Sequence, residues 1–184
     1  MDFRESSQPD YPGSKHPGWE EIFRRFGIRR LGIAGWQMFP YPIMRNIIAA
    51  LGREEAVIPA DDLIRRLTIR KSAAEQAYLR RAAKISELGF KAVLEAIRPG
   101  MTEAELCGIA TQAMLGAGAE ATGYPVWCCS GPNSNQAISR PTLRQVKNGE
   151  IIHFSIGAKV EGYSASIGRP VVLGTCPEPV RRFL

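Results

Sequence analysis

The chain has 184 residues, a net charge of +6 and 45% hydrophobic residues. This length suits one domain, or a small domain with part of another, and the composition is that of a globular protein with a buried core. No apolar run approaches the roughly 20 residues that a membrane-spanning helix needs, and the polar N-terminus lacks the apolar centre of a signal peptide. We therefore expect a cytoplasmic protein with no membrane partner.

The basic residues and the cysteines exclude further classes of function. Basic residues are scattered as doublets, such as Arg24 with Arg25, which is typical of solvated helix faces and argues against a nucleic-acid partner. The four cysteines are Cys107, Cys128, Cys129 and Cys176. They form no C-x-x-C pair, and the chain has only two histidines. The sequence therefore predicts reduced cysteines and no zinc site; a catalytic thiol is disfavoured because no base lies nearby.

The first 70 residues alternate short predicted helices and strands. Residues 1–18 are rich in Pro, Gly and Ser, and we expect them to be flexible. Helices are predicted over residues 19–27 and 41–52, a helix or turn over 61–70, and strands over 29–35 and 55–60. An aspartate, Asp61 or Asp62, is available to cap the third helix. Such alternation predicts part of a layered α/β domain.

The region from residue 71 onward opens with two predicted amphipathic helices. Each begins with the pattern of a capping box, Ser72 with Glu75 and Thr102 with Glu105. Apolar residues follow in the first helix at helical spacing, namely Ala82, Ile85, Leu88 and Ala92. Gly and Pro residues end both helices, at 99–100 and at 116–118. We expect the two helices to pack on a sheet.

The predicted sheet follows in the remaining sequence. Residues 124–131 form a β-rich run that ends in the turn-forming loop SGPNSNQ. Residues 151–174 indicate a hairpin, with Gly162 at a position that tolerates positive φ. Ser155 and Ser166 stand eleven residues apart on its two arms. The last residues begin another helix near Pro179.

These motifs occur in the order of a known family. KSAAEQAYLRRAAKI, IRPGMTEAEL, SGPNS, RPT with NGE, IGAKVEGY and the closing Arg169 together resemble the pita-bread family. That family includes Xaa-Pro aminopeptidases (aminopeptidase P), prolidases, methionine aminopeptidases and creatinase. The resemblance implies an α+β fold in which residues 71–184 form the first half of the catalytic domain. Residues 19–70 resemble the last αβ elements of a creatinase-type N-terminal domain.

The resemblance also implies a metal site that this sequence does not match. Metallopeptidases of the family hold two divalent metals, commonly Mn, Co or Zn, with two Asp, one His and two Glu. The two Asp lie on a hairpin like this one, where this chain has Ser155 and Ser166. The His and both Glu belong to the second half of the domain. Because a serine hydroxyl is neutral and divalent metals favour carboxylates, we expect no metal cofactor.

Two histidine positions bear on substrate binding. The family holds substrate with a His in the loop after SG, where this chain has Ile138 or Ser139. Strand alternation places His153 on the same face as Ser155. A rise of about 3.3 Å per residue separates the two side chains by about 7 Å, too far for a direct hydrogen bond. A half-buried structural histidine is the favoured interpretation of His153, and a substrate-binding residue or base for Ser155 is the alternative.

Three functional hypotheses follow. The first is a truncated Xaa-Pro aminopeptidase- or creatinase-like protein that is inactive as a metallopeptidase on its own. The second is a metal-free amidinohydrolase. The resemblance implies this possibility because creatinase, a member of the same family, cleaves creatine to sarcosine and urea without metal. The third is a non-catalytic binding module. A substrate would be a peptide or a small guanidino or amide compound. An exposed sheet edge predicts either a homo-oligomer or an incomplete part of a longer protein.

Overall fold

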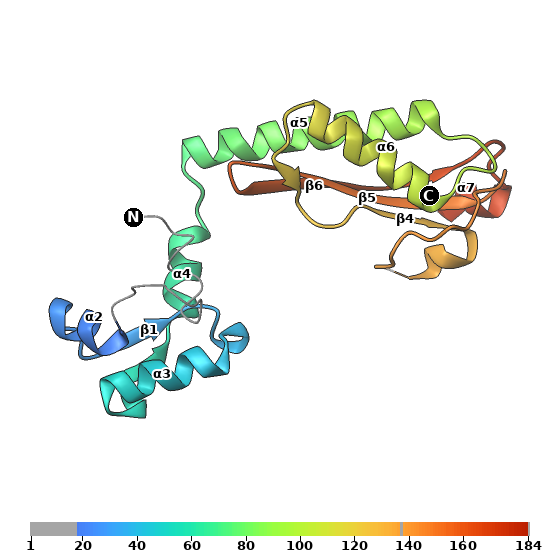
Figure 1. Ribbon diagram of the computed structural model, residues 1–184. Helices are drawn as coiled ribbons and strands as arrows, with labels where there is room; N and C mark the ends of the chain where they lie inside the picture. The colour runs from blue at the N-terminus through green and yellow to red at the C-terminus, as the bar shows by residue number, and fades with distance from the viewer. Residues whose placement is uncertain (1–17, 137, 184) are drawn as a thin grey trace. The chain divides into compact units, whose positions relative to one another are not determined.

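A computed structural model describes residues 18–136 and 138–183. Contacts divide the chain into two compact units, the first ending at Arg70 and the second beginning at Lys71 (Figure 1). The predicted flexible segment, residues 1–18, lies outside the described residues except for Gly18.

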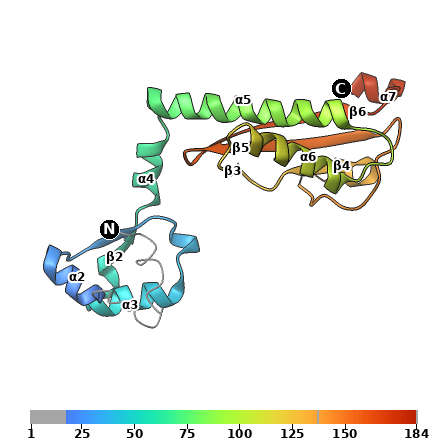
Figure 2. The ribbon, with the colours of Figure 1, turned by 45° about the horizontal axis from the view of Figure 1, so that its top comes forward.

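The first unit contains short helices around a two-stranded sheet. Its helices and strands are α2 (Trp19–Phe26), β1 (Leu31–Ile33), α3 (Tyr41–Leu51), β2 (Val57–Pro59) and α4 (Asp61–Thr68), with 3₁₀ turns η1 (Trp36–Met38) and η2 (Glu54–Ala56). Strands β1 and β2 pair in parallel (Figure 2). Their core consists of Phe23, Ile33, Ile47 and Val57. The elements lie where the sequence predicted them.

Glycines end two of these helices, but no aspartate caps the third. Gly27 and Gly52 have φ of 63° and 73°, a left-handed conformation that Gly adopts without the strain of a Cβ. The N-cap of α4 is Ala60, and it makes no side-chain cap bond. Asp61 instead accepts the Gly35 N–H at 2.8 Å. The predicted aspartate cap is therefore wrong, because Asp61 lies one residue inside the helix and binds a distant turn.

The second unit is an antiparallel sheet covered by two helices. Its elements are α5 (Ala73–Ala96), α6 (Glu103–Gly116), β3 (Ala121–Thr122), β4 (Trp127–Ser130), η3 (Gly131–Asn135), β5 (Ile151–Val160), β6 (Tyr163–Val172) and α7 (Glu178–Phe183). Strand β5 is central and pairs with β3, β4 and β6, always antiparallel. Helices α5 and α6 lie on one face of this sheet in both views (Figures 1 and 2).

Both predicted capping boxes are present. The Ser72 hydroxyl accepts the Glu75 N–H at 3.3 Å, and the Glu75 carboxylate accepts the Ser72 N–H at 2.6 Å. Thr102 and Glu105 exchange the equivalent bonds at 3.1 and 2.7 Å. Each box satisfies two N–H groups that the first turn of a helix leaves without partners. These bonds fix where α5 and α6 begin.

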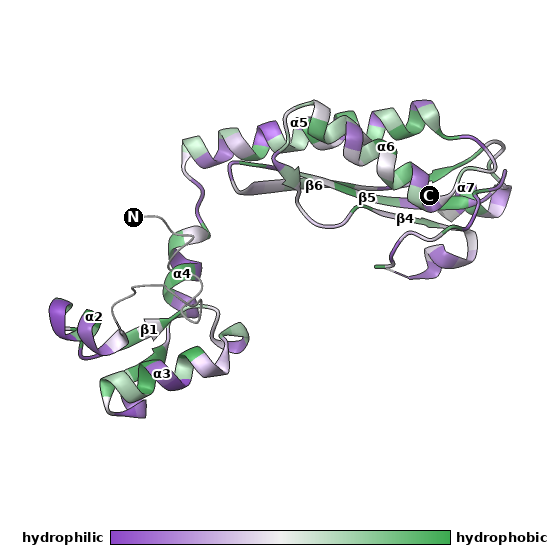
Figure 3. Ribbon diagram, viewed as in Figure 1, coloured by the Kyte–Doolittle hydropathy of each residue, from purple (hydrophilic) through white to green (hydrophobic). Residues whose placement is uncertain are grey.

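The buried stripe of α5 differs from the predicted one. Figure 3 shows hydrophilic and hydrophobic bands along this helix. Its buried residues are Ala82, Ile85, Ser86, Gly89 and Val93. Leu88, which the sequence pattern placed on the apolar face, is 50% exposed. Gly89 lies in the core in its stead. Helix α6 passes so close to this position that a Cβ on residue 89 would lie 2.7 Å from the Met114 side chain.

The hairpin is as regular as its sequence indicates. Glu161 and Gly162 form a two-residue turn with φ of 50° and 79°, which is typical of a type I′ turn. Ile152, Phe154, Ile156, Ala158 and Val160 are buried on the side of the helices. The intervening residues of β5 therefore point to the opposite side, away from α5 and α6.

Candidate functional site

The two serines of the hairpin lie on the uncovered side of the sheet. Ser155 is opposite Gly168, and Ser166 is opposite Gly157. They are therefore diagonal neighbours on one face, roughly 7–8 Å apart by Cα positions in a regular sheet. We call this surface the serine face; it consists of Tyr124, Trp127, His153, Ser155, Gly157 and Ser166.

Tyr124 supplies the direct partner of Ser155. Its hydroxyl lies 2.8 Å from the Ser155 hydroxyl. Its ring packs on Trp127, with ring centroids 4.9 Å apart. A Cβ on Gly157 would come within 3.0 Å of the Tyr124 ring and 3.2 Å of the Ser166 Cβ, so the glycine makes room for both. Sequence reasoning missed Tyr124, because 31 residues separate it from Ser155 and no local motif links them.

The serine face does not fit a pair of divalent metals. Ser155 and Ser166 offer only neutral hydroxyls, and the Ser155 hydroxyl is engaged with Tyr124. The hairpin carboxylate, Glu161, is exposed at the turn. Within the described residues, no group of three or more His, Cys, Asp or Glu side chains is placed to hold a metal ion. Without carboxylates, this face lacks the negative charge that offsets two dications.

His153 stands beside this pair of serines but does not bind them. It is half-buried, opposite Pro170 on β6 and Cys129 on β4. Its side chain makes no hydrogen bond to any described residue. The absence of a Ser155–His153 bond agrees with the spacing argument from the sequence. His153 therefore presents an imidazole toward the serine face without a described partner.

The cysteines offer no nucleophile near this face. All four are free thiols. A hydrogen bond with Cys107, together with burial, raises the pKa of Cys128 far above its ordinary value. Burial also raises the pKa of Cys129, although its thiol donates to the Ser139 carbonyl at 3.7 Å. Raised thiol pKa values keep these side chains protonated and poorly nucleophilic.

A buried carboxylate anchors the loop that follows β4. Glu103 is fully buried at the start of α6. It accepts the N–H and hydroxyl of Ser130 at 2.7 Å each, and those of Thr142 at 2.9 and 2.7 Å. The Asn133 amide adds bonds of 3.1 and 3.2 Å. Burial alone raises the pKa of Glu103, but the bonds from Thr142 and Ser130 outweigh burial and lower it overall.

An ion pair extends this anchor. Arg144 forms a bidentate salt bridge with Glu150, and one of its two hydrogen bonds has an N···O distance of 2.9 Å. Arg144 also donates to the Ser130 hydroxyl at 2.7 Å. This pairing lowers the pKa of Glu150 and raises that of Arg144. The residues of SGPNS and RPT thus hold the loop, whereas Ile138, one of the two candidates for the expected histidine position, is 66% exposed.

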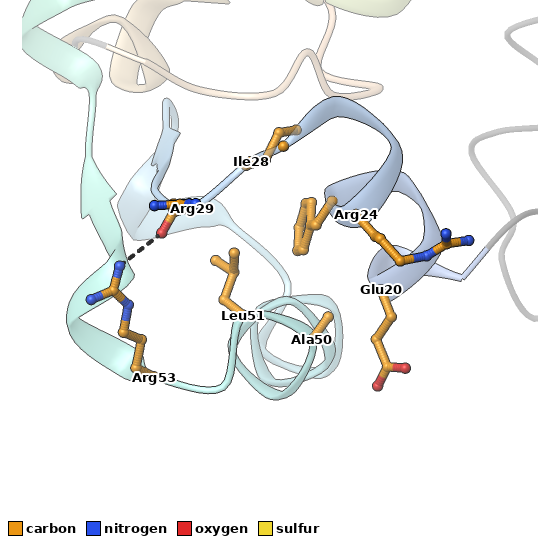
Figure 4. A pocket seen from close by; sticks show the side chains of 9 residues that line it. Glu20, Arg24, Ile28, Arg29, Ala50, Leu51 and Arg53 are labelled. Carbon is orange, nitrogen blue, oxygen red and sulfur yellow. Dashed lines mark hydrogen bonds between the residues drawn. The ribbon is translucent and has the colours of Figure 1, made fainter.

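The first unit contains a separate cleft of about 370 Å³ (Figure 4). Its lining residues are Glu20, Phe23, Arg24, Gly27, Ile28, Arg29, Ala50, Leu51 and Arg53. Arg53 donates to the Arg29 carbonyl at 3.2 Å, which joins the two sides of the cleft. The cleft lies near the C-terminal ends of α2 and α3, where Gly27 and Gly52 cap the last carbonyl groups of each helix.

One further property concerns membranes. None of the helices that the structure describes combines the length and apolarity needed to cross a bilayer.

Comparisons with known proteins identify the family. The model of metallopeptidase family M24 matches residues 77–183, more than half of the chain. The uncharacterized peptidase YqhT of Bacillus subtilis is 27% identical over 165 residues, which cover 90% of this chain and 46% of that protein. The creatinase of Bacillus sp. (strain B-0618) is 28% identical over 156 residues, 80% of this chain and 37% of the relative.

A solved structure shows the same fold. The X-Pro aminopeptidase of Thermotoga maritima superposes with a TM-score of 0.81 at 26% identity, covering 89% of this chain and 45% of that one. The chain therefore spans about half the length of the relatives it matches. The predicted α+β pita-bread fold, present over about half of its domain, is confirmed. By its matched residues and by its fold, the chain belongs to metallopeptidase family M24.

Proposed function

We propose that this chain is an Xaa-Pro aminopeptidase- or creatinase-like protein that does not act as a dinuclear metallopeptidase on its own. The observation that supports this proposal is the chemistry of the serine face. Ser155 and Ser166 occupy the hairpin positions where the family resemblance places metal-binding aspartates, and Ser155 is bonded to Tyr124 at 2.8 Å. Neither hydroxyl supplies the negative charge that a divalent metal requires.

Titration with Mn, Co and Zn, followed by calorimetry, tests the proposal directly. We expect no stoichiometric binding that depends on Ser155 or Ser166, and no cleavage of an Xaa-Pro dipeptide after metal is added. The double variant Ser155→Asp/Ser166→Asp should gain affinity for a divalent cation, because diagonal carboxylates on one face reach a shared ion. Metal-dependent peptidase activity of the unaltered chain would contradict the proposal.

A matched variant separates a restored site from added charge. Ser155→Asp/Ser164→Asp carries the same two charges on the same face, but residue 164 is opposite Lys159 rather than Gly157. The two carboxylates are then too far apart to share one ion. We expect this control to bind divalent cations no better than the unaltered chain does. Equal gains in both double variants would show that charge alone, and not the ligand positions, attracts the metal.

A second candidate is metal-free hydrolysis of small guanidino or amide compounds. It is favoured by the neutral serine face and by the 28% identity to a creatinase. In this alternative, His153 binds the substrate beside Ser155 and Tyr124. Release of urea from creatine and related guanidino compounds, lost in His153→Ala, would support it. No urea release by a folded chain would leave the non-catalytic binding module as the better hypothesis.

A further inference from the structure

The cleft of the first unit combines an apolar floor with a basic rim. Ile28 and Leu51 line it, are half-buried, and pack against the core of this unit. Arg24, Arg29 and Arg53 line it as well and are exposed. Its volume of about 370 Å³ falls in the range of roughly 300–1,000 Å³ that small-molecule sites occupy. The cleft therefore has the size and the mixed lining of a site for a small amphiphilic molecule.

Hydrogen-bond donors without partners gather on one side of this cleft. Figure 4 shows Arg29 and Arg53 on that side, and Arg24 with Glu20 on the other. The Arg53 guanidinium donates to the Arg29 carbonyl at 3.2 Å. The Arg29 guanidinium forms no hydrogen bond or ion pair with any residue that the structure describes. A guanidinium carries five N–H donors in a planar fork that suits a carboxylate, so most of these donors remain available.

The charge of the lining favours an anion on the same side. Three arginines and one glutamate, Glu20, leave two positive charges. The C-terminal ends of α2 and α3 oppose them with only about half a negative charge each. The carbonyls of Phe23 and Ile48 at these ends already accept main-chain N–H groups, at 2.8 and 2.9 Å. Because Glu20 lies beside Arg24, the positive charge is concentrated at Arg29 and Arg53.

We propose that this cleft binds a small organic carboxylate with an apolar tail. Arg29 and Arg53 hold the carboxylate, and the tail covers Ile28 and Leu51. Each methylene group that leaves water strengthens binding by up to about fourfold, so the apolar floor selects for a tail. Inorganic phosphate suits the guanidinium groups but gains nothing from this floor. The site belongs to the first unit and is independent of the function proposed for the serine face.

Titration of the ¹⁵N-labelled full chain, followed by NMR at physiological ionic strength, tests the ligand class. Hexanoate should shift the amides of residues 27–29 and 50–53 and the side-chain Nε–H signals of Arg29 and Arg53, but no signal of the second unit. Acetate lacks the tail and hexanamide lacks the charge, so each should bind at least about tenfold more weakly. Acetate or inorganic phosphate that binds as tightly as hexanoate, or hexanoate shifts centred elsewhere, would overturn the proposal.

A pair of neighbouring variants tests the role of Arg29. Arg29→Gln should weaken hexanoate binding by about tenfold, the effect of losing one charge-assisted hydrogen bond. Arg30→Gln removes the same charge one residue later, from an exposed side chain that does not line the cleft. It should weaken binding by about twofold at most, because salt screens such a charge. Equal losses in the two variants would show general attraction and not a site.

Folding of both variants is checked in the same amide spectra. Neither arginine side chain forms a hydrogen bond or ion pair with a residue in the described part of the chain, so both substitutions should leave the first unit folded. The comparison of hexanoate with acetate and hexanamide needs no substitution. It decides for or against the tail and the carboxylate even if a variant failed to fold.

Discussion

Glu103 shows how one buried residue organises the loop beside the serine face. A carboxylate without exposure is costly unless its oxygens are fully hydrogen-bonded. Here Ser130, Asn133 and Thr142 supply donors from two separate segments. The charged form is therefore favoured over the neutral form, and the pKa of Glu103 is lowered. The loop between Ser130 and Thr142 is consequently held at both ends by one side chain.

Glu103→Gln should destabilise the protein by about 2 kcal/mol, because the amide nitrogen replaces an oxygen that accepts three hydrogen bonds and then faces their donors. Since the folded pKa is lowered, the stabilisation is present above the ordinary pKa of 4.5 and disappears as the pH falls through the folded value. Wild-type stability should thus decrease below about pH 4.5 more steeply than that of Glu103→Gln. Urea unfolding at several pH values measures both effects.

Glu105→Gln is the matched control for this prediction. Glu105 lies two residues later on α6, is exposed, and serves the capping box. Glutamine also completes a capping box, so stability should change little. If Glu105→Gln cost as much as Glu103→Gln, burial of the charged network would not be the cause.

At the scale of elements, Ser86 fixes α5 on the sheet. Its hydroxyl accepts the Ala158 N–H of β5 at 2.9 Å and lies 2.8 Å from the Ala165 carbonyl of β6. A helix side chain thus enters the ladder between two strands. The same helix is tied to the hairpin end by the Tyr163–Glu75 bond and by the stacking of Tyr78 on Tyr163. These contacts fix the register of α5 along the hairpin.

Ser86→Ala should lower the free energy of unfolding by about 1–3 kcal/mol, since the buried Ala158 N–H loses its acceptor. The amide of Ala158 should also exchange its hydrogen faster with solvent. Ser164→Ala, an exposed serine of the same sheet, should change neither quantity. Unchanged exchange at Ala158 in Ser86→Ala would show that the strand ladder satisfies this N–H without the serine.

At the scale of the whole molecule, the described residues form two cores with no residue in common. The first contains Phe23, Ile33, Ile47 and Val57. The second lies between α5, α6 and the sheet and includes Phe154, a fully buried aromatic residue. Each unit therefore buries its own apolar surface, and each carries its own hydrophobic stabilisation.

We expect the two units to respond separately to core truncation. Ile47→Ala should destabilise the first unit by about 2–5 kcal/mol, and Phe154→Ala the second by about 3–5 kcal/mol. Hydrogen exchange resolved by residue measures each unit. Loss of protection in both units after either substitution would show that they unfold as one.

The sequence by itself determined the local elements and the family. Capping boxes, glycine stops and the hairpin turn depend on residues close together in the chain, so Ser72, Gly27 and Gly162 could be assigned directly. The serine positions followed from the family motifs in the same way. Only the tertiary structure decided that Tyr124 binds Ser155, that Glu103 holds the distant Ser130 and Thr142, and that Gly89 replaces Leu88 in the core. These contacts join residues far apart in sequence, where packing between elements outweighs local pattern.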